Sequence, residues 1–311
     1  MMNKFRSIPS SFSVSSEVAQ AVQLGLPLVA LETAVVTHGL PRPHNLSLAQ
    51  SLERIVREEG AVPATLGILG GKVHIGLTPT ELDRLANVDG ARKISRRDFG
   101  IALARGEDGG TTVAGTLIAA RLAGIRVFAT GGIGGVHRNA PFDVSADLPE
   151  LGRSPLVVVC AGAKSVLDLP ATVEVLETSG VPIIGYQTAE FPAFYSRQSG
   201  LPVDVQVNSP AEVARIAQAH WKMGLESALL VVQPPPAEVA LPADLVEEIL
   251  RLALAEAEEK KISGAAVTPF LLDRVSQLSG GASLTANLAL LENNARLAAQ
   301  IAAALQLRQV I

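Results

Sequence analysis

An α/β fold is the class that the sequence predicts, as one large domain over residues 1–311 with a mixed central β-sheet between layers of helices (α/β/α). Short apolar runs rich in β-branched residues, such as 126–130 and 156–161, have the length and composition of buried strands. Segments with helical spacing alternate with these runs, which is the pattern of an α/β sheet. The chain shows neither an internal repeat nor a long linker, so we expect a single domain after a flexible N-terminal segment over residues 1–14.

The composition is that of an ordered globular protein. Of the 311 residues 48% are hydrophobic and 18% are charged, so the chain can bury a sizeable core. The 26 Lys and Arg against 30 Asp and Glu give a net charge of −4 without a basic run, and aromatic residues make up only 4%. A nucleic-acid polymer is therefore not an expected partner, since proteins that bind one carry basic patches or aromatic stacking platforms.

Cys160 is the only cysteine, so an intramolecular disulfide is impossible. We interpret it as a small buried hydrophobic residue rather than a nucleophile, because it falls in the apolar run 156–161. The N-terminus has no apolar stretch of signal-peptide length and no apolar run approaches ~20 residues, so we expect no membrane association. Together with the lone cysteine, these features predict a cytoplasmic protein.

Helix and strand patterns follow one another closely along the chain. In the first half we expect a helix over 15–24 that stops before Gly25, a strand over 28–31, a helix from an N-cap at Asn45 through Glu59, a hairpin of 64–71 and 72–77 turning at Gly70-Gly71, a helix over 80–86 with a capping box of Thr78 and Glu81, and a helix over 113–123. In the second half we expect a helix after Lys164 through Thr178, a strand over 183–185, a helix over 212–221, a strand over 228–232, and helices over 242–261, 268–278 and 283–306. The aromatic segment 188–197 is either a lid or subunit contact, or ordinary core packing.

Two of the predicted strands are followed by glycine-rich loops. The run 126–130 precedes Gly131-Gly132-Ile133-Gly134-Gly135, and the run 156–161 precedes Gly162-Ala163-Lys164-Ser165. Ligands of open α/β sheets bind beyond the carboxyl ends of the strands, so both loops are candidate walls of a site. The segment between them holds a dense set of polar residues, namely His137, Arg138, Asp143, Ser145 and Asp147.

A carboxylate also stands at the end of a strand. Glu32 directly follows the apolar run 28–31 and precedes the turn Thr37-His38-Gly39-Leu40-Pro41. Capping at the surface is one interpretation of such a residue. We favour a functional role, because a uniformly apolar strand is expected to be buried on both faces.

Two segments are candidates for holding an anion. The sequence Gly109-Gly110-Thr111-Thr112-Val113 opens a helix, whose N-terminus offers backbone N–H groups and the positive end of its dipole. The cations of Lys93-Ile94-Ser95-Arg96-Arg97-Asp98 form either a solvated turn or a phosphate contact. Neither G-x-x-x-x-G-K-[ST] nor G-x-G-x-x-G occurs, so chemistry on nucleoside triphosphates or dinucleotides gains no support.

Lys164 is the candidate nucleophile. It follows an apolar strand among the small residues Ala161-Gly162-Ala163, where desolvation is expected to lower the pKa of a lysine. A neutral amine can attack a carbonyl and form a Schiff base, whereas the alternative is a lysine that extends to solvent. Glu32 could then serve as a proton donor or base.

Asp143 and Asp147 could hold a hard cation through oxygen ligands. No His or Cys spacing supports zinc, so Mg²⁺ or Mn²⁺, mostly coordinated by water, suits these residues better. From the residues alone we infer a small-molecule enzyme with a lysine, a carboxylate and a hard metal ion. Its substrate would be a phosphorylated carbonyl compound.

The sequence resembles the pseudouridine-5′-phosphate glycosidase family, also called the indigoidine synthase A-like family, over about 15–303. The resemblance is carried by ordered blocks, namely ALETAVVTHGLPRPHN (30–45), PATLGILGGKVHIGLT (63–78), KISRRDF (93–99), GGTTVAGTLIAARLAGIRVFATGGIGGVHR (109–138), FDVSADLPEL (142–151), VCAGAKSVLDLP (159–170), EFPAFY (190–195), VTPFLLDRV (267–275) and LTANLALLENNARLAAQIA (284–302). Thr33-Ala34 departs from the Ser-Thr expected after the acid, which removes a hydroxyl near Glu32, while Gly70 and Gln233-Pro234-Pro235-Pro236 depart in loops.

The resemblance implies reversible cleavage of the C–C glycosidic bond of pseudouridine 5′-phosphate to uracil and ribose 5-phosphate, through a ring-opened ribose–lysine Schiff base. It implies Lys164 as the nucleophile, Glu32 as the proton donor and Asp143 as the ligand of a divalent metal ion, typically Mn²⁺. Whether Asp143 or Asp147 contacts the ion stays open. Substrate contacts are implied for Lys93, Val113, Ser145, Ala146 and Asp147, and Asn287 is a further pocket candidate.

The family resemblance also implies a homotrimer. Two other functions are left open by the sequence. One is a Schiff-base aldolase or lyase acting on another phosphorylated sugar, which would need Lys164 as well. The other is a sugar-phosphate-binding protein without catalytic activity, because a shared fold does not guarantee a shared chemistry.

Overall fold

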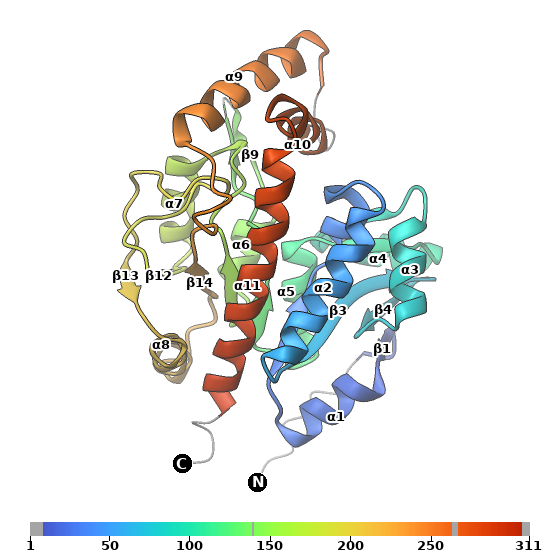
Figure 1. Cartoon of the computed structure of the whole chain (residues 1–311). Coiled ribbons are helices and arrows are strands. Elements are labelled where there is room, and N and C mark those ends of the chain that lie inside the picture. The colour runs from blue at the N-terminus through green and yellow to red at the C-terminus, as the bar shows by residue number, and fades with distance from the viewer. Residues whose placement is uncertain (1–8, 139, 263–266, 307–311) are drawn as a thin grey trace.

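One mixed β-sheet runs through the computed structural model, which describes residues 9–138, 140–262 and 267–306 (Figure 1). Its strand order is β1-β4-β3-β2-β7-β10-β14-β12-β13, with β6 added on β3 and β5 on β6. The bounds of these strands are β1 Phe12–Val14, β2 Leu28–Leu31, β3 Val62–Leu69, β4 Lys72–Ile75, β5 Arg92–Ile94, β6 Gly109–Thr111, β7 Val127–Ala129, β10 Val157–Cys160, β12 Ile183–Tyr186, β13 Val205–Val207 and β14 Leu229–Val232. The β3 strand pairs antiparallel with β4 and β6, whereas the run from β3 to β13 is parallel. The predicted fold class is therefore confirmed.

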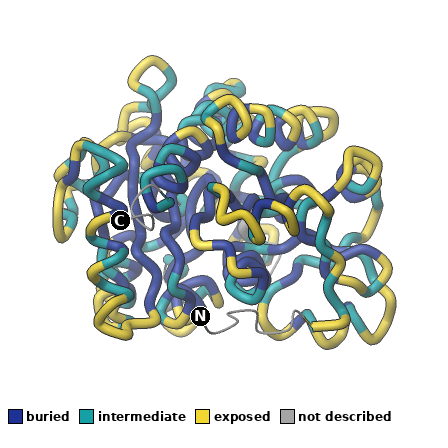
Figure 2. The backbone as a smooth tube through the Cα atoms, turned by 90° about the horizontal axis from the view of Figure 1, so that it is seen from below, coloured by how far each residue is buried: buried dark blue, intermediate teal, exposed yellow. Residues whose placement is uncertain are grey.

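Helices cover the sheet on both faces, and their apolar sides form the core. The bounds are α1 Ser16–Leu24, α2 His44–Glu58, α3 Pro79–Asn87, α4 Phe99–Arg105, α5 Val113–Leu122, α6 Asp147–Leu151, α7 Leu169–Thr178, α8 Pro210–Lys222, α9 Ala243–Glu259, α10 Val267–Leu278 and α11 Ala282–Gln306. The long helix α11 lies between α2 and α8 over β2, β7 and β10, and α5 packs on α6 behind the sheet (Figure 1). Buried backbone fills the middle of the molecule and exposed turns surround it (Figure 2).

A second, small sheet stands beside the large one. It consists of β8 Val136–His137, β9 Ala140–Val144 and β11 Leu167–Asp168, in the order β11-β8-β9 with antiparallel pairing. Among the described residues, none of the helices combines the length and apolar character that crossing a membrane requires.

Several local predictions are confirmed at their predicted residues. The hairpin of β3 and β4 turns at Gly70 and Gly71, which have φ values of 54° and 74° that favour glycine. Helix α3 begins with the predicted capping box, in which the side chains of Thr78 and Glu81 bond reciprocally to backbone N–H groups.

Other predictions need correction. Phe12–Val14 pairs with β4, so the last residues of the expected flexible segment form a strand, while residues 1–8 lie outside the described part. Asn45 is not an N-cap, because it lies inside α2, where its buried amide donates to the Val36 and Ala86 carbonyls. Of the two interpretations of segment 188–197, its buried aromatic residues Phe191, Phe194 and Tyr195 favour core packing.

The sequence pattern missed strands β5 and β6. Each has three residues, and their pairing depends on tertiary neighbours rather than on alternating hydrophobicity. The position of Gly109 in β6 requires glycine, because a Cβ atom there would lie 2.6 Å from Ile94 Cγ1 of the adjacent strand. This close approach brings Lys93 on β5 toward the end of β2.

Candidate active site

A cavity lies at the carboxyl ends of three adjacent parallel strands. Strands β2, β7 and β10 are neighbours in the sheet, and they are followed by Glu32, the Gly131-Gly132 loop and the loop that carries Lys164. The cavity has a volume of about 60 Å³, and we call it the inner cavity. It is lined by Glu32, Ala34, Val35, His38, Gly39, Lys93, Gly131, Gly132, Lys164, Phe194, Leu272, Asn287 and Leu291. Four sequence-predicted site residues, Glu32, Lys93, Lys164 and Asn287, therefore meet in one place.

Backbone hydrogen bonds fix the two glycine-rich loops side by side. Ala161 N–H donates to the Gly131 carbonyl at 2.8 Å, and Ile133 N–H donates to the Gly162 carbonyl at 3.0 Å. Lys164 N–H in turn donates to the Ile133 carbonyl at 3.1 Å. The position of Lys164 is thus set by a short ladder between loops, which places its side chain at the cavity wall.

The surroundings of Glu32 raise the pKa of its carboxyl group. Thr130 Oγ1 donates a short hydrogen bond to Glu32 Oε1. Burial raises the pKa of Glu32 above its usual value, and the nearby Asp147 charge acts in the same direction. The cations Lys164 and Lys93 and the Thr130 hydroxyl oppose this shift without reversing it. A carboxyl group with a raised pKa can donate a proton near neutral pH.

Lys93 lies in the same electrostatic cluster. Burial lowers the pKa of Lys93, and the charge of Lys164 lowers it further, while Asp147 and Glu32 oppose the shift. Two lysines and two carboxylates thus share a small space whose water access is limited. In such a place each charge acts strongly on its neighbours.

Asp147 connects the cavity wall to helix α5. Its buried carboxylate accepts hydrogen bonds from Ala114 N–H and Gly134 N–H, both at 2.8 Å. Gly115 N–H also donates to the Thr112 hydroxyl, at 3.2 Å. The prediction of free N–H groups at the start of this helix is therefore wrong for Ala114 and Gly115, because side chains of the chain itself already bind them.

The other predicted substrate contacts do not line the inner cavity. Val113 is the first residue of α5 and is buried, and Ser145 Oγ accepts from Asp147 N–H at 3.2 Å. Ser145 also packs against Gly134, where a Cβ atom would lie 2.7 Å from that of Ser145. Ala146, the residue between Ser145 and Asp147, is exposed.

Asp143 lies apart from the cavity, on strand β9 of the small sheet. Its side chain is 56% exposed, and its Oδ2 atom is 4.0 Å from His137 Nδ1. Among the described residues, no group of three or more His, Cys, Asp or Glu side chains is arranged to hold a metal ion.

His38 is a cavity residue to which the sequence pattern assigned no role. It sits on a π-helical turn, η1 Val35–Gly39, and its Nδ1 is 2.6 Å from Thr37 Oγ1. Burial lowers the pKa of His38, and Lys93 lowers it further, while the Ala91 carbonyl opposes the shift. A π-helical turn has no signature in hydrophobic periodicity, although such turns are frequent at functional sites.

Phe194 is the second residue that the sequence pattern did not place in the site. Its φ of 63° is unusual for a bulky side chain, and its ring covers Gly132, where a Cβ atom would lie 2.7 Å away. Ring and glycine are therefore matched in shape. The aromatic segment contributes a cavity wall as well as core packing.

Helix α11 supplies one side of the cavity through residues at helical spacing. Asn287 and Leu291 line it, and Asn294 follows on the same face. The buried Asn294 amide donates to the Thr130 carbonyl at 2.9 Å and to the Gly131 carbonyl at 3.4 Å. Asn287 thus lines the cavity, as predicted for it, whereas Asn294 holds the loop after β7.

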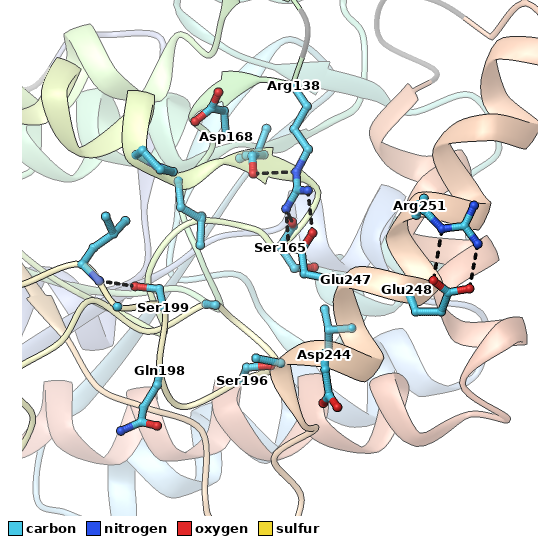
Figure 3. Close-up of a pocket in the computed structure, with 18 of the residues that line it drawn as sticks. Arg138, Ser165, Asp168, Ser196, Gln198, Ser199, Asp244, Glu247, Glu248 and Arg251 are labelled. Carbon is cyan, nitrogen blue, oxygen red and sulfur yellow. Dashed lines mark hydrogen bonds and ion pairs between the residues drawn. The ribbon is translucent and has the colours of Figure 1, made fainter.

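A larger hollow lies elsewhere, between α9, β11 and the loop around 190–201 (Figure 3). Its arginines already have partners, since Arg138 pairs with Glu247 at 2.8 Å and Arg251 pairs with Glu248 at 2.7 Å. Lys164 and Glu32 do not line it. Size alone therefore does not identify the site, and the small cavity with the clustered charges is the candidate.

The chain is similar to known proteins over nearly its whole length. The family described as indigoidine synthase A like protein matches residues 17–304. A pseudouridine-5′-phosphate glycosidase from Geobacillus kaustophilus is 53% identical over 290 residues, which are 93% of this chain and 96% of the relative. One of the same name from Gemmatimonas aurantiaca is 54% identical over 291 residues, covering 94% and 95% of the two chains.

Two solved structures share the fold. The prealnumycin C-glycosynthase AlnA in complex with ribulose 5-phosphate superimposes with a TM-score of 0.90 at 41% identity, covering 97% of this chain and 99% of that one. An indigoidine synthase A-like protein from Thermotoga maritima gives a TM-score of 0.88 at 39% identity, covering 97% and 100%. The chain described here belongs to the indigoidine synthase A like family.

Proposed function

We propose that this protein is a pseudouridine-5′-phosphate glycosidase, a lyase that reversibly cleaves pseudouridine 5′-phosphate to uracil and ribose 5-phosphate. Relatives with this name are about half identical over nearly the whole chain. The observation that carries the proposal is that Lys164 and Glu32 line one cavity at the ends of adjacent strands.

The bond to be broken explains why a lysine is needed. In a C-nucleoside the base is joined to the sugar through carbon, so no heteroatom of the base can be protonated to make it leave. A pair of carboxylates, which serves ordinary glycosidases, is therefore a poor fit. An amine bonded to the sugar carbon can instead accept the electron deficit left when the carbon–carbon bond breaks.

Glu32 and Lys164 can each be given a role in this reaction. Glu32 donates a proton to the ring oxygen, so that the sugar opens and the amine of Lys164 bonds to C1′. The C1′–C5 bond then breaks, its electron pair stays with the base, C5 takes up a proton, and the lysine nitrogen is left in an imine with the sugar. Water hydrolyses the imine, which releases ribose 5-phosphate and regenerates Lys164.

Substrate contacts are proposed for the surrounding residues. Lys93 offers a cation inside the cavity, which suits the anionic substrate. Val113, Ser145 and Ala146 border the same loop, and Asp147 holds that loop to α5. Asn287 presents its amide to the cavity from α11.

A divalent cation, Mn²⁺ or else Mg²⁺, is proposed at Asp143. Its half-exposed carboxylate suits a hydrated hard ion that takes its remaining ligands from water and substrate phosphate. Both oxygens of Asp147 already accept backbone N–H groups, which favours Asp143 as the ligand. When bound, such an ion would neutralise phosphate charge. Chelation is expected to abolish turnover and added Mn²⁺ to restore it; turnover that survives exhaustive chelation would contradict the assignment.

The assembly and the location of the protein are also proposals. The family resemblance supports a homotrimer. The only cysteine is buried and free, which is the state expected in a reducing compartment, and this supports a cytoplasmic location. The proposed substrate, pseudouridine 5′-phosphate, is small and charged, so no membrane partner or nucleic-acid polymer is required.

One observation favours a second candidate, a Schiff-base lyase acting on another phosphorylated sugar. The related AlnA was solved with ribulose 5-phosphate, a ketose phosphate. Incubation of this protein with pseudouridine 5′-phosphate separates the two functions. Stoichiometric release of uracil and ribose 5-phosphate supports the glycosidase, and intact pseudouridine 5′-phosphate alongside turnover of another sugar phosphate would contradict it.

A further inference from the structure

Thr130 is the residue that follows β7, and its hydroxyl donates a hydrogen bond to Glu32 Oε1. We propose that Thr130 and Asn294 are positioning residues for the acid: Thr130 keeps the proton of Glu32 on Oε2, and Asn294 on α11 holds Thr130 in place. Neither side chain lines the inner cavity, so both act through Glu32. The inference rests on the proposed function, because it concerns the proton that Glu32 gives to the substrate.

The direction of this hydrogen bond decides where the acidic proton lies. A threonine hydroxyl has one proton to donate, and the acceptor of the Thr130 proton among the described residues is Glu32 Oε1. If Oε1 carried the carboxyl proton, it would donate to Thr130, and the Thr130 proton would lose its acceptor. Thr130 is 1% exposed, so water would not replace that acceptor and the arrangement would cost free energy. The proton of the neutral carboxyl group therefore belongs on Oε2, the oxygen left for the substrate.

The backbone of Thr130 is held from two sides. Its N–H donates to the Val159 carbonyl of β10 at 3.0 Å, and its carbonyl accepts from Asn294 Nδ2 at 2.9 Å. The hydroxyl makes the third connection, to Glu32 at the end of β2. A hydroxyl whose own backbone is fixed in this way donates to Oε1 in one direction, which is what the orientation of a catalytic acid requires.

Asn294 is an unfavourable residue for its place in α11. It is 1% exposed, in a stretch of the helix where Leu290 and Leu291 are also buried. Asparagine is a poor helix former, and the Oδ1 atom of Asn294 has no hydrogen-bond partner among the described residues. Its amide N–H groups donate to the carbonyls of Thr130 and Gly131. A leucine would suit the helix and the core better, so we attribute the asparagine to the position of the loop after β7.

Thr130→Val is the direct test, because valine has the shape of threonine without the hydroxyl. We expect kcat to fall about tenfold, the effect of one hydrogen bond, with an unchanged KM. The Thr130 hydroxyl lowers the pKa of Glu32, so its removal should raise that pKa further. Glu32 then stays protonated to higher pH, and the alkaline limb of kcat/KM should move to higher pH. Thr130→Ser, which keeps the hydroxyl, should retain both the rate and the limb.

Asn294→Leu tests the second step, because it removes the amide that holds Thr130. We expect kcat to fall about three- to tenfold and the alkaline limb to move in the same direction as in Thr130→Val, by a smaller amount. Asn293→Leu, the same change one residue earlier on α11, is the matched control. In the described part of the chain the loop carbonyls accept from Asn294 and not from Asn293, so this variant should change neither quantity.

The other titratable groups around Glu32 are the same in all these variants. They come from other elements, namely Lys93, Asp147, Lys164 and His38. A difference in the alkaline limb between Thr130→Val and Thr130→Ser therefore reports the hydrogen bond to Glu32.

A measurement without turnover separates this inference from the proposed function. The C=O stretch of a protonated carboxyl group in infrared difference spectra reports the protonation of Glu32, and Glu32→Gln identifies its band. The pKa obtained from this band should be higher in Thr130→Val than in the unaltered protein. It should be unchanged in Thr130→Ser and Asn293→Leu.

Failure of the unaltered protein to release uracil would contradict the proposed function, whereas the infrared titration would still test the hydrogen bond. An equal pKa of Glu32 in Thr130→Val and the unaltered protein, or an equal loss of kcat in Thr130→Ser and Thr130→Val, would overturn the inference. An alkaline limb that does not move in a folded Asn294→Leu would remove Asn294 from this role, because a loss of packing alone lowers the rate without moving the limb. Thermal unfolding shows which variants fold, and the Thr130 pair decides if Asn294→Leu does not.

Discussion

Individual side chains determine the proton chemistry of the site. Burial raises the pKa of Glu32, although two lysines lie in the same cavity wall. Desolvation therefore outweighs attraction at this position. The same balance lowers the pKa of Lys93, for which burial and the neighbouring Lys164 act together.

Glu32→Gln is expected to slow turnover by about 10²–10⁴-fold, because the amide cannot donate the proton. In the unaltered protein, kcat/KM should fall as pH rises through the raised pKa of Glu32, and this limb of the pH profile should be missing in the variant.

The raised pKa of Glu32 also affects stability, because the folded state binds this proton more tightly than the unfolded state. Its contribution is thus present at low pH and is lost as pH rises through the folded pKa.

A steady-state pH profile with both proteins checks this prediction. An equal alkaline limb in both, or an unchanged rate in the variant, would remove Glu32 from the mechanism. Melting temperatures measured over the same pH range show whether the loss reflects chemistry or unfolding.

The site residues also differ in how well the sequence pattern predicts them. Glu32 and Lys164 are found because each directly follows an apolar strand or its short loop, and parallel strands end at the same edge. His38 is harder to find, since its π-helical turn has no periodicity. The placement of Phe194 in the cavity wall depends on its positive φ, which the sequence does not suggest because phenylalanine rarely adopts it. The family resemblance, rather than spacing, implied Asn287.

At the scale of elements, an ion pair with a buried carboxylate connects two parts of the site. Glu150 on α6 is fully buried, and Arg96 Nε and Nη2 donate to its carboxylate at 2.7 and 2.9 Å. Arg96 follows β5, which carries Lys93, and Glu150 follows Asp147 on α6. The pair therefore sets the distance between the Lys93 strand and the Asp147 loop.

Arg96→Gln is expected to raise the KM for pseudouridine 5′-phosphate about tenfold, by allowing Lys93 to move relative to Asp147. Arg153→Gln is the matched control, because Arg153 bonds the same carboxylate at 3.0 Å from three residues along the chain. Both variants should lose roughly 1–3 kcal/mol of unfolding free energy, since each leaves Glu150 with fewer partners.

Steady-state kinetics and chemical denaturation measure the two effects. If both variants raise the KM equally, Arg96 acts through stability alone and has no positioning role. If neither raises it, the distance between β5 and α6 does not matter for binding.

Elements differ in how well the sequence predicts them. Strands β2, β7 and β10 are predicted because their residues are apolar and buried on both faces. The three-residue strands β5 and β6 are not, because Gly109-Gly110 has no strand preference and becomes a strand only where close packing excludes a side chain. Asn45 resembles an N-cap in sequence, but tertiary partners for its amide place it within α2.

At the scale of the whole molecule, exposed apolar residues bear on the proposed trimer. Phe142 on β9 is fully exposed, and the nearby Val144 is 39% exposed. An aromatic ring of this size on a protruding strand gains stability when a second copy covers it. Asp143, the proposed metal ligand, lies between them.

Phe142→Asp is therefore expected to shift the protein from trimer toward monomer in sedimentation velocity. Met223→Asp is the matched control, because Met223 is 78% exposed at the end of α8, far along the chain from β9, and should leave the assembly unchanged. A trimer that persists in Phe142→Asp at low protein concentration would place the subunit contact elsewhere.

The whole account depends on imine formation at one lysine. Two lysines line the inner cavity, so the measurement must distinguish Lys164 from Lys93. Borohydride reduction in the presence of ribose 5-phosphate, followed by peptide mass mapping, does so directly. The account predicts one reduced sugar adduct on Lys164 that is absent in Lys164→Ala. An adduct on Lys93 instead, or none in a folded and active protein, would contradict it.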